Sequence, residues 1–391
     1  MRRVSVLGAT GSIGQNTLDL IARAPDDYDV VALTGASNIA QLATDAVALK
    51  AEVAVTARED LLDDLRDALA GSGVTAAAGA QAITEAASRP ADWVMSAIVG
   101  AAGLAPGLAV AAQGNTTLAL ANKESLVCAG PLLLETARAA GAKIMPVDSE
   151  HSAIYQALIG EDMDAVERII ITASGGAFRD WPLEKLAEAT LAEASSHPNW
   201  DMGQRITIDS ASMFNKAMEI IETREFFGVR PDQIEVIVHP QSMIHALVGF
   251  NDGALMAHVG PPDMRHAIGF ALHHPARQHL PVERLDLAAI GQLDFRAPDE
   301  VRWPALRLAR ETLERGGMMG AVFNAAKETA LDRFIAGDLG FTEMSQVVAQ
   351  TLDHMNTHCD HIDAKMTLDN VGRVDHLARK AAKAAVVKRA G

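Results

Sequence analysis

Three short polar runs concentrate carboxylates, amides and ammonium groups at close spacing: Asn122-Lys123-Glu124, Asp148-Ser149-Glu150 and Asn215-Lys216-Ala217-Met218-Glu219. Carboxylate oxygens suit a hard divalent cation, and amide and ammonium donors suit a phosphate. On an extended chain, two acids separated by one residue would point to the same side, as we expect for Asp148 and Glu150. Asn215 and Glu219 are four residues apart in a predicted helix and therefore share one face. We predict that the chemistry of the protein is located at these runs.

The candidate metal ligands are Asp148, Glu150 and Glu219. No His or Cys pair with ligand spacing accompanies them, so Mg²⁺ or Mn²⁺ fits this set better than a softer metal. The alternative is that Asp148 caps a helix beginning at Ser149 while Glu219 lies on a solvated face.

Hydroxyl, amide and ammonium donors for a phosphate monoester come from Ser174 in a Ser-Gly-Gly loop, and from Ser210, Asn215 and Lys216. Each of them is also an ordinary turn or cap residue. Lys123 follows an apolar strand, which places it at the carboxyl edge of a sheet, where ligands collect. The polar, aromatic and glycine-punctuated stretch from His197 to Gly203 suggests either a lid or a static surface loop.

A glycine loop, Gly8-Ala9-Thr10-Gly11-Ser12-Ile13-Gly14, follows the first predicted strand and opens a helix. Backbone amides at such a helix N-terminus can bind a pyrophosphate, and Thr10 and Ser12 add hydroxyl donors. The next strand ends at Gly35-Ala36-Ser37-Asn38, without the acid that an NAD-binding fold uses for the ribose diol. NADPH is therefore favoured, with Gly35, Ser37 and Asn38 at the 2′-phosphate end.

The elements that would position these residues alternate between strands and helices up to about residue 148, which predicts a parallel, doubly wound sheet. An apolar β-rich run lies at residues 168–172, and strand-like stretches at 234–238, 245–250 and 254–259 predict a second sheet with antiparallel members. The fold class is therefore α/β, with an N-terminal Rossmann-type domain (1–148), an α/β catalytic domain (149–274) and a C-terminal α-helical domain (305–391). A lid at about 194–205 and a connector at 275–304 complete the expected organisation.

Composition narrows the class of protein. The chain has 391 residues, 49% of them hydrophobic, and a formal net charge of -16, which argues against nucleic acid as a partner. Its two cysteines, Cys128 and Cys359, are expected to be free thiols in a reducing compartment. The uncharged stretch at 94–112 is too rich in Ala and Gly for a membrane helix and is read as a buried strand and a helix start. No signal peptide is visible at the first residues, so the cytoplasm is expected.

Taken together, the motifs resemble the 1-deoxy-D-xylulose 5-phosphate reductoisomerase family over nearly the whole chain. The stretches that carry the resemblance are GATGSIG at Gly8, IVGAAGL at Ile98, ANKESLV at Ala121, PVDSEHSAIYQ at Pro146, SGGAFR at Ser174, HPNWDMG at His197, IDSASMFNKAMEIIE at Ile208 and HPQSMIH at His239. One departure is that Gly-Lys-Asn is common in the family where Ala36-Ser37-Asn38 stands here.

The resemblance implies an NADPH-dependent and metal-dependent rearrangement and reduction of a sugar phosphate in non-mevalonate isoprenoid synthesis, carried out by a homodimer. The implied metal ligands are Asp148, Glu150 and Glu219, and Lys123 and His197 complete the catalytic set. The implied substrate contacts are Lys123, Ser149, Glu150, Ser174, His197, Ser210, Asn215, Lys216 and Glu219. The implied NADPH contacts are Thr10, Gly11, Ser12, Ile13, Asn122, Glu124 and Gly203.

Two other functions fit parts of the pattern. A plain NADP-linked dehydrogenase of phosphorylated substrates would not need three carboxylates, so metal-independent activity would favour it. A catalytically silent dinucleotide sensor would bind NADPH without turnover.

Overall fold

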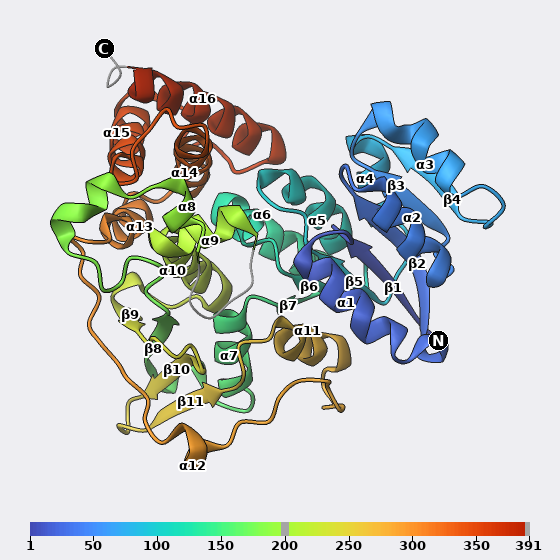
Figure 1. Cartoon of the computed structure of the whole chain (residues 1–391), viewed down its shortest axis with the longest axis horizontal. Helices are drawn as coiled ribbons and strands as arrows, with labels where there is room; N and C mark the ends of the chain where they lie inside the picture. The colour runs from blue at the N-terminus through green and yellow to red at the C-terminus, as the bar shows by residue number, and fades with distance from the viewer. Residues whose placement is uncertain (197–202, 388–391) are drawn as a thin grey trace. The chain divides into compact units, whose positions relative to one another are not determined.

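The structure is a computed structural model, and it describes residues 1–196 and 203–387 (Figure 1). The described residues form two compact units. The first contains residues 1–125, 133–152 and 263–283, and the second contains the described parts of 126–132, 153–262 and the chain from 284 onward. The domains expected from sequence were continuous stretches, whereas each unit combines three separate ones. The expected domain bounds stay a prediction.

The first unit is built on a seven-stranded parallel sheet. Its strands are β1 (Arg2–Leu7), β2 (Tyr28–Gly35), β3 (Val53–Thr56), β4 (Thr75–Ala78), β5 (Trp93–Ser96), β6 (Thr117–Leu120) and β7 (Lys143–Pro146). Their order is β4-β3-β2-β1-β5-β6-β7, and every pairing is parallel. The strand order reverses between β1 and β5, which is where ligands bind in open sheets of this kind. The predicted doubly wound sheet is confirmed.

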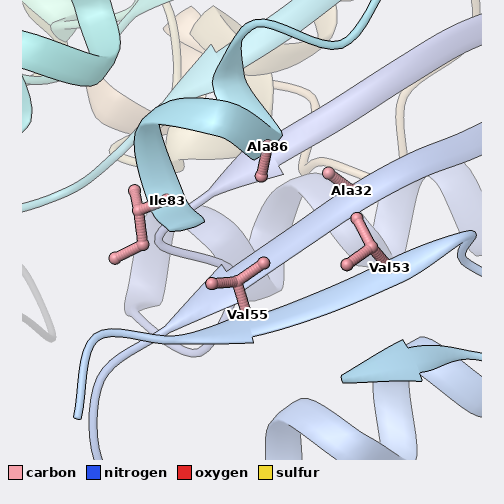
Figure 2. Close-up of a cluster of buried hydrophobic side chains, with 5 residues drawn as sticks. All are labelled: Ala32, Val53, Val55, Ile83 and Ala86. Atoms are coloured by element: carbon pink, nitrogen blue, oxygen red, sulfur yellow. The ribbon is translucent and has the colours of Figure 1, made fainter. Parts of the chain in front are cut away.

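Helices connect these strands and bury the two faces of the sheet. They are α1 (Ser12–Ala22), α2 (Ile39–Ala48), α3 (Leu62–Ala68), α4 (Ala80–Ala87), α5 (Leu104–Ala111) and α6 (Lys123–Ala140). Figure 2 shows how α4 covers the sheet: its Ile83 and Ala86 pack against Ala32 of β2 and Val53 and Val55 of β3. Because βαβ crossovers are right-handed, the helices before and after the reversal lie on opposite faces.

One helix that is distant in sequence completes the first unit. Helix α11 (Met264–His273) packs against α1, β6 and β7. The indole Nε1 of Trp93, a buried residue on β5, donates to the carbonyl oxygen of Ala271 at 3.0 Å. Helix α11 thus covers a part of the sheet that lies beside α1, which explains why residues 263–283 belong to this unit.

An ionic network fastens α11 to α1, and we predict its pH dependence. Arg265 lies 2.7 Å from Asp263 and 3.4 Å from Asp19. Burial acts to raise the pKa of Asp263, but its hydrogen bonds with Arg265 outweigh burial and lower the pKa. A carboxyl with a depressed folded pKa adds stability above its unfolded pKa, and this stability is lost as pH falls through the folded pKa. Arg265→Met should therefore lower the melting temperature at pH 7, and this effect should shrink as the pH is lowered through the acid range.

The energy involved is small, at most about 1 kcal/mol, because the three side chains are partly exposed and solvent screens the charges. Thermal melts of Arg265→Met across this pH range would measure it. The matched control is Arg66→Met, because Arg66 pairs with Asp63 on the exposed surface of α3. Equal melting shifts for the two variants, or a shift that grows as the pH falls, would contradict the prediction.

The uncharged stretch at 94–112 folds as expected from sequence. Strand β5 ends at Ser96 and α5 begins at Leu104. Among the described residues, no helix has the length and apolar character needed to cross a membrane.

The second unit contains a four-stranded mixed sheet and the C-terminal helices. Its strands are β8 (Val166–Ala173), β9 (Ile234–Val238), β10 (Ile244–Phe250) and β11 (Leu255–Val259), in the order β11-β10-β8-β9. Strand β10 is antiparallel to β8 and β11, while β8 and β9 are parallel. The predicted antiparallel members are confirmed. The remaining helices are α7 (Ser149–Ala157), α8 (Leu191–Ala194), α9 (Gln204–Ala211), α10 (Phe214–Phe227), α12 (Leu287–Ile290), α13 (Pro304–Arg315), α14 (Met319–Ile335), α15 (Glu343–His358) and α16 (Leu368–Val387).

Candidate functional site

The glycine loop joins β1 to α1, as predicted. Gly8 has φ +90, and a Cβ there would lie 2.5 Å from the carbonyl oxygen of Ala97. A Cβ on Gly14 would overlap the carbonyl oxygens of Gly8 and Ala9. A Cβ on Gly11, in contrast, would meet only the Gly8 oxygen, at 3.5 Å, and Gly11 is exposed. The fold itself therefore requires Gly8 and Gly14, whereas Gly11 leaves open space beside the backbone.

The start of α1 has the character of an anion site. Gly11 is its N-cap and offers no side chain to the first-turn amides. Those amides carry the positive end of the helix dipole, which favours phosphate. Thr10, Ser12 and Ile13 flank this point, with Ser12 exposed.

The end of β2 lies against the glycine loop. The Ala9 amide donates to the Thr34 carbonyl at 2.6 Å, and a Cβ on Gly35 would lie 3.2 Å from the Thr10 side chain. Ser37 and Asn38 follow and are exposed. The side chain of Asn38 accepts from the amide of Gln41 at 3.2 Å and so caps α2. The structure thus brings the predicted cofactor positions of β1 and β2 together.

Asn122 is buried and holds the chain after β6. Its amide nitrogen donates to the carbonyls of Ile98 and Gly100 at 2.7 and 3.0 Å, and to Glu124 at 2.8 Å. Its oxygen accepts from the Ser125 amide at 3.1 Å, which caps α6. These bonds occupy the side chain of Asn122 within the first unit and fix where α6 begins.

Lys123 and Asp148 meet at the carboxyl edge of the parallel sheet. They follow the neighbouring strands β6 and β7, whose last residues pair in register. The Nζ of Lys123 lies 2.5 Å from Oδ2 of Asp148, with side chains 12% and 9% exposed. Burial acts to raise the pKa of Asp148, but the Lys123 charge and the His151 ring outweigh it, so this pKa lies well below its usual range. Asp148 is therefore a carboxylate at neutral pH.

The expectation that Asp148 and Glu150 leave one extended strand is wrong. Strand β7 ends at Pro146 and α7 begins at Ser149, so Glu150 lies in the first turn of a helix. Ser149 Oγ donates to Glu150 at 2.6 Å. A helical start suits a carboxylate here because the first-turn amides favour negative charge.

His151 lies at this site although it was not among the residues predicted from the sequence. It is fully buried, and its Nδ1 lies 3.9 Å from Oδ1 of Asp148. Its position three residues after Asp148, where a helix begins, could have indicated it, because residues three apart lie on the same face of a helix.

Helix α10 carries the third acid, in the second unit. Asn215 donates to Glu219 Oε1 at 2.6 Å, which confirms that the two share a helix face. Lys216 forms an ion pair with the other oxygen of Glu219. Glu219 is 1% exposed and Lys216 4%, so the alternative of a solvated face for Glu219 is wrong.

The segments that carry the predicted phosphate donors are neighbours in the second unit. Ser174 follows β8, and its Oγ accepts from the Gly176 amide at 3.1 Å. A Cβ on Gly176 would lie 2.8 Å from the Ser210 carbonyl, so this loop packs on the end of α9. A single turn at Met213, with φ 60, then leads into α10 and Asn215.

His197 and the central half of the predicted lid at about 194–205 lie outside the described residues, 1–196 and 203–387. Gly203 is described and is the exposed N-cap of α9. The lid, the role of His197 and the cofactor contact of Gly203 stay predictions.

Comparisons with known proteins decide the family. Three family models match: 1-deoxy-D-xylulose 5-phosphate reductoisomerase over residues 4–130, its C-terminal domain over 144–227, and a DXP reductoisomerase C-terminal domain over 259–381. A protein of that name from Ruegeria pomeroyi is 72% identical over 391 residues, covering 100% of this chain and 99% of its own. The chain belongs to the 1-deoxy-D-xylulose 5-phosphate reductoisomerase family. The family predicted from the motifs is confirmed.

Solved reductoisomerase structures agree over the full length. The Zymomonas mobilis enzyme in complex with NADPH is 47% identical, with a TM-score of 0.92, covering 98% of this chain and 99% of its own. A DOX-P reductoisomerase in complex with NADPH, fosmidomycin and magnesium is 38% identical, with a TM-score of 0.93 and coverage of 99% and 98%. A curated reductoisomerase from Jannaschia is 68% identical over 387 residues, covering 99% of this chain and 98% of its own.

Proposed function

We propose that this protein converts 1-deoxy-D-xylulose 5-phosphate to 2-C-methyl-D-erythritol 4-phosphate, using NADPH and Mg²⁺ or Mn²⁺, in non-mevalonate isoprenoid synthesis. The observation that carries the proposal is the 72% identity to a reductoisomerase across the whole chain. Two reductoisomerase structures, one with NADPH and one with NADPH and magnesium, support the cofactors.

Asp148, Glu150 and Glu219 are proposed to bind the metal. They offer only carboxylate oxygens, which Mg²⁺ and Mn²⁺ prefer. Glu219 is buried beside the Lys216 cation and the Asn215 amide, and its carboxylate has lone pairs beyond those that these two contacts use, which can coordinate a cation. When bound, such a cation supplies Lewis acidity that polarises a carbonyl and stabilises developing negative charge.

The chain's own residues hold and orient the substrate. Lys123, already beside Asp148, presents an ammonium that can hydrogen-bond a substrate oxygen, and Ser149 adds a hydroxyl. Ser174, His197, Ser210, Asn215 and Lys216 are proposed to hold the phosphate and the neighbouring hydroxyls. Contacts to a phosphate far from the reacting carbons supply binding energy that orients the substrate.

The glycine loop is proposed to bind the NADPH pyrophosphate, with contacts from Thr10, Gly11, Ser12 and Ile13. The first-turn amides of α1 and the open space at Gly11 support this. Gly35, Ser37 and Asn38 are proposed to surround the 2′-phosphate, and Asn122, Glu124 and Gly203 to contact the cofactor elsewhere. NADPH supplies the hydride that reduces the rearranged aldehyde.

We also propose a cytoplasmic homodimer that associates through the sheet of the second unit. Strand β11 lies at its edge, and Leu255, Met256 and Val259 on that strand are 48%, 40% and 41% exposed. Apolar side chains on an edge strand favour association with a second copy. A monomeric mass in sedimentation would contradict this proposal.

The test of function follows NADPH absorbance with purified protein and 1-deoxy-D-xylulose 5-phosphate, with Mg²⁺ or Mn²⁺ and again after chelation. We expect NADPH oxidation that requires both the substrate and the metal, and that returns when metal is restored. Oxidation that persists after chelation would favour the plain dehydrogenase instead. NADPH binding without oxidation under any metal condition would favour the sensor.

A further inference from the structure

An ion pair between Lys327 and Asp209 lies beside the proposed phosphate donors and has no part in the function described above. Lys327 on α14 places its Nζ 2.9 Å from Oδ2 of Asp209 on α9. Their side chains are only 6% and 11% exposed. Both helices belong to the second unit, and the two residues are 118 positions apart in the chain.

Buried ion pairs are poor stabilisers, because desolvation of the two charges offsets most of their attraction. An apolar pair of similar volume would serve stability equally well. The ion pair instead fixes how the two side chains point toward each other, because the ammonium and the carboxylate must meet at hydrogen-bonding distance. A role in setting the orientation of α9 therefore accounts for the pair better than stability does.

The same face of α14 also anchors the next helix. Phe323, four residues before Lys327, packs edge-on against Phe214, the first residue of α10, with ring centroids 6.0 Å apart. Residues four apart lie on one side of a helix, so α14 contacts α9 and α10 through one face. The two anchored positions, Asp209 and Phe214, immediately precede the proposed phosphate donors Ser210 and Asn215.

The connection between α9 and α10 makes such anchoring necessary. Met213 has φ 60, which is unfavourable for a residue with a side chain and persists only when the surroundings hold it. Successive residues on a helix are about 100° apart, so the direction of Asp209 determines that of Ser210. A rotation of α9 that moved Ser210 by about 1 Å could cost up to about 100-fold in rate.

We propose that Lys327 is a positioning residue for recognition of the substrate's phosphate: its ion pair with Asp209 sets the orientation of α9, and thereby of Ser210. The inference rests on the proposed function, in which Ser210 and its neighbours bind that phosphate. Neither Lys327 nor Asp209 needs to touch the substrate.

The central test is steady-state kinetics of Lys327→Met and Asp209→Asn. We expect KM for 1-deoxy-D-xylulose 5-phosphate to rise by about tenfold or more, while KM for NADPH stays within about twofold. Inhibition by inorganic phosphate should weaken in parallel with the rise in substrate KM. Lys327→Arg, which keeps the charge and can still reach a carboxylate, should recover most of the substrate affinity.

A double variant separates positioning from stability. A single substitution leaves one buried charge without its partner and should also lower the melting temperature. Asp209→Asn combined with Lys327→Met removes both charges and should recover the melting temperature, but not the KM for the substrate. Recovery of both would overturn the proposal, because the pair would then serve stability alone.

The matched control uses an exposed ion pair between the same two helices. Arg205 of α9 lies 2.5 Å from Asp332 of α14, with side chains 44% and 58% exposed. Asp332→Asn, which removes this pair from the α14 side and lies outside the predicted lid, should leave both KM values unchanged. The proposal would be overturned if the control raised the substrate KM as much as Lys327→Met does. It would also be overturned if Lys327→Met raised KM for substrate and for NADPH equally, because the variant would then have loosened the packing of the whole protein.

Two further variants distinguish failure of this inference from failure of the proposed function. Ser210→Ala and Lys216→Met remove proposed phosphate donors directly and should raise the substrate KM. If they do so and Lys327→Met does not, the positioning role is wrong and the phosphate site stands. If none of them changes the substrate KM, the proposed phosphate site itself is wrong.

Discussion

Replacing Glu219 with glutamine is expected to lower kcat by about 1000-fold while the affinity for NADPH stays within about twofold of wild type. The substitution keeps the shape of the side chain but removes the negative charge that the proposed metal site needs. Glu219 also accepts from Asn215 and pairs with Lys216, and a glutamine amide would direct N–H donors toward other donors. The substitution should therefore weaken binding of the metal and the substrate. Binding of NADPH at the glycine loop of the first unit should be unaffected.

Two measurements check this expectation: turnover at saturating Mg²⁺ and a fluorescence titration of NADPH without substrate. The matched control is Glu225→Gln, six residues further along α10. Burial raises the pKa of Glu225, and a neutral side chain of the same shape should be tolerated there. Equal losses of turnover and NADPH affinity in Glu219→Gln would argue that the variant is misfolded or that Glu219 has another role. Near-normal turnover would remove Glu219 from the metal site.

The parallel sheet was predictable because its strands, such as β3 (Val53–Thr56), are apolar runs separated by helices. Strand β4 and helix α4 were not predicted from sequence. Their segments, Thr75–Ala78 and Ala80–Ala87, consist largely of alanine, which favours helix and gives no strand alternation. Strand β4 and helix α4 are defined by their packing on β3, and intrinsic secondary-structure propensity carries no information about that packing.

The candidate site was predictable where its geometry is local. Asn215 and Glu219 meet because helical spacing brings them together, and Lys123 reaches Asp148 because parallel strands end at one edge. The side-chain direction of Glu150 was predicted wrongly. Helix α7 begins at Ser149, so Glu150 is helical and does not continue an extended strand. The pairing of Lys327 with Asp209 depends on the packing of α14 against α9, and no spacing in the sequence indicates it.

The glycine loop yields the second large effect, in which two similar substitutions should fail in different ways. Gly14→Ala would place a methyl group on the carbonyl oxygens of Gly8 and Ala9. These are backbone atoms of the β1–α1 turn and have no rotamer by which to move away. We expect a loss of about 3 kcal/mol or more in stability, with little folded protein at 37 °C. Thermal melts and the yield of soluble protein would measure it.

Gly11→Ala is the matched variant in the same loop. Its methyl group would meet only the Gly8 oxygen at 3.5 Å, and φ at Gly11 is -81, which alanine adopts without strain. The melting temperature should therefore stay close to wild type. The methyl group would, however, occupy the space where a pyrophosphate approaches the backbone, so KM for NADPH should rise by about tenfold or more, with little change in substrate affinity. Unchanged NADPH affinity in a well-folded Gly11→Ala would mean that the pyrophosphate does not approach this glycine, and the cofactor would have to bind elsewhere on the sheet edge.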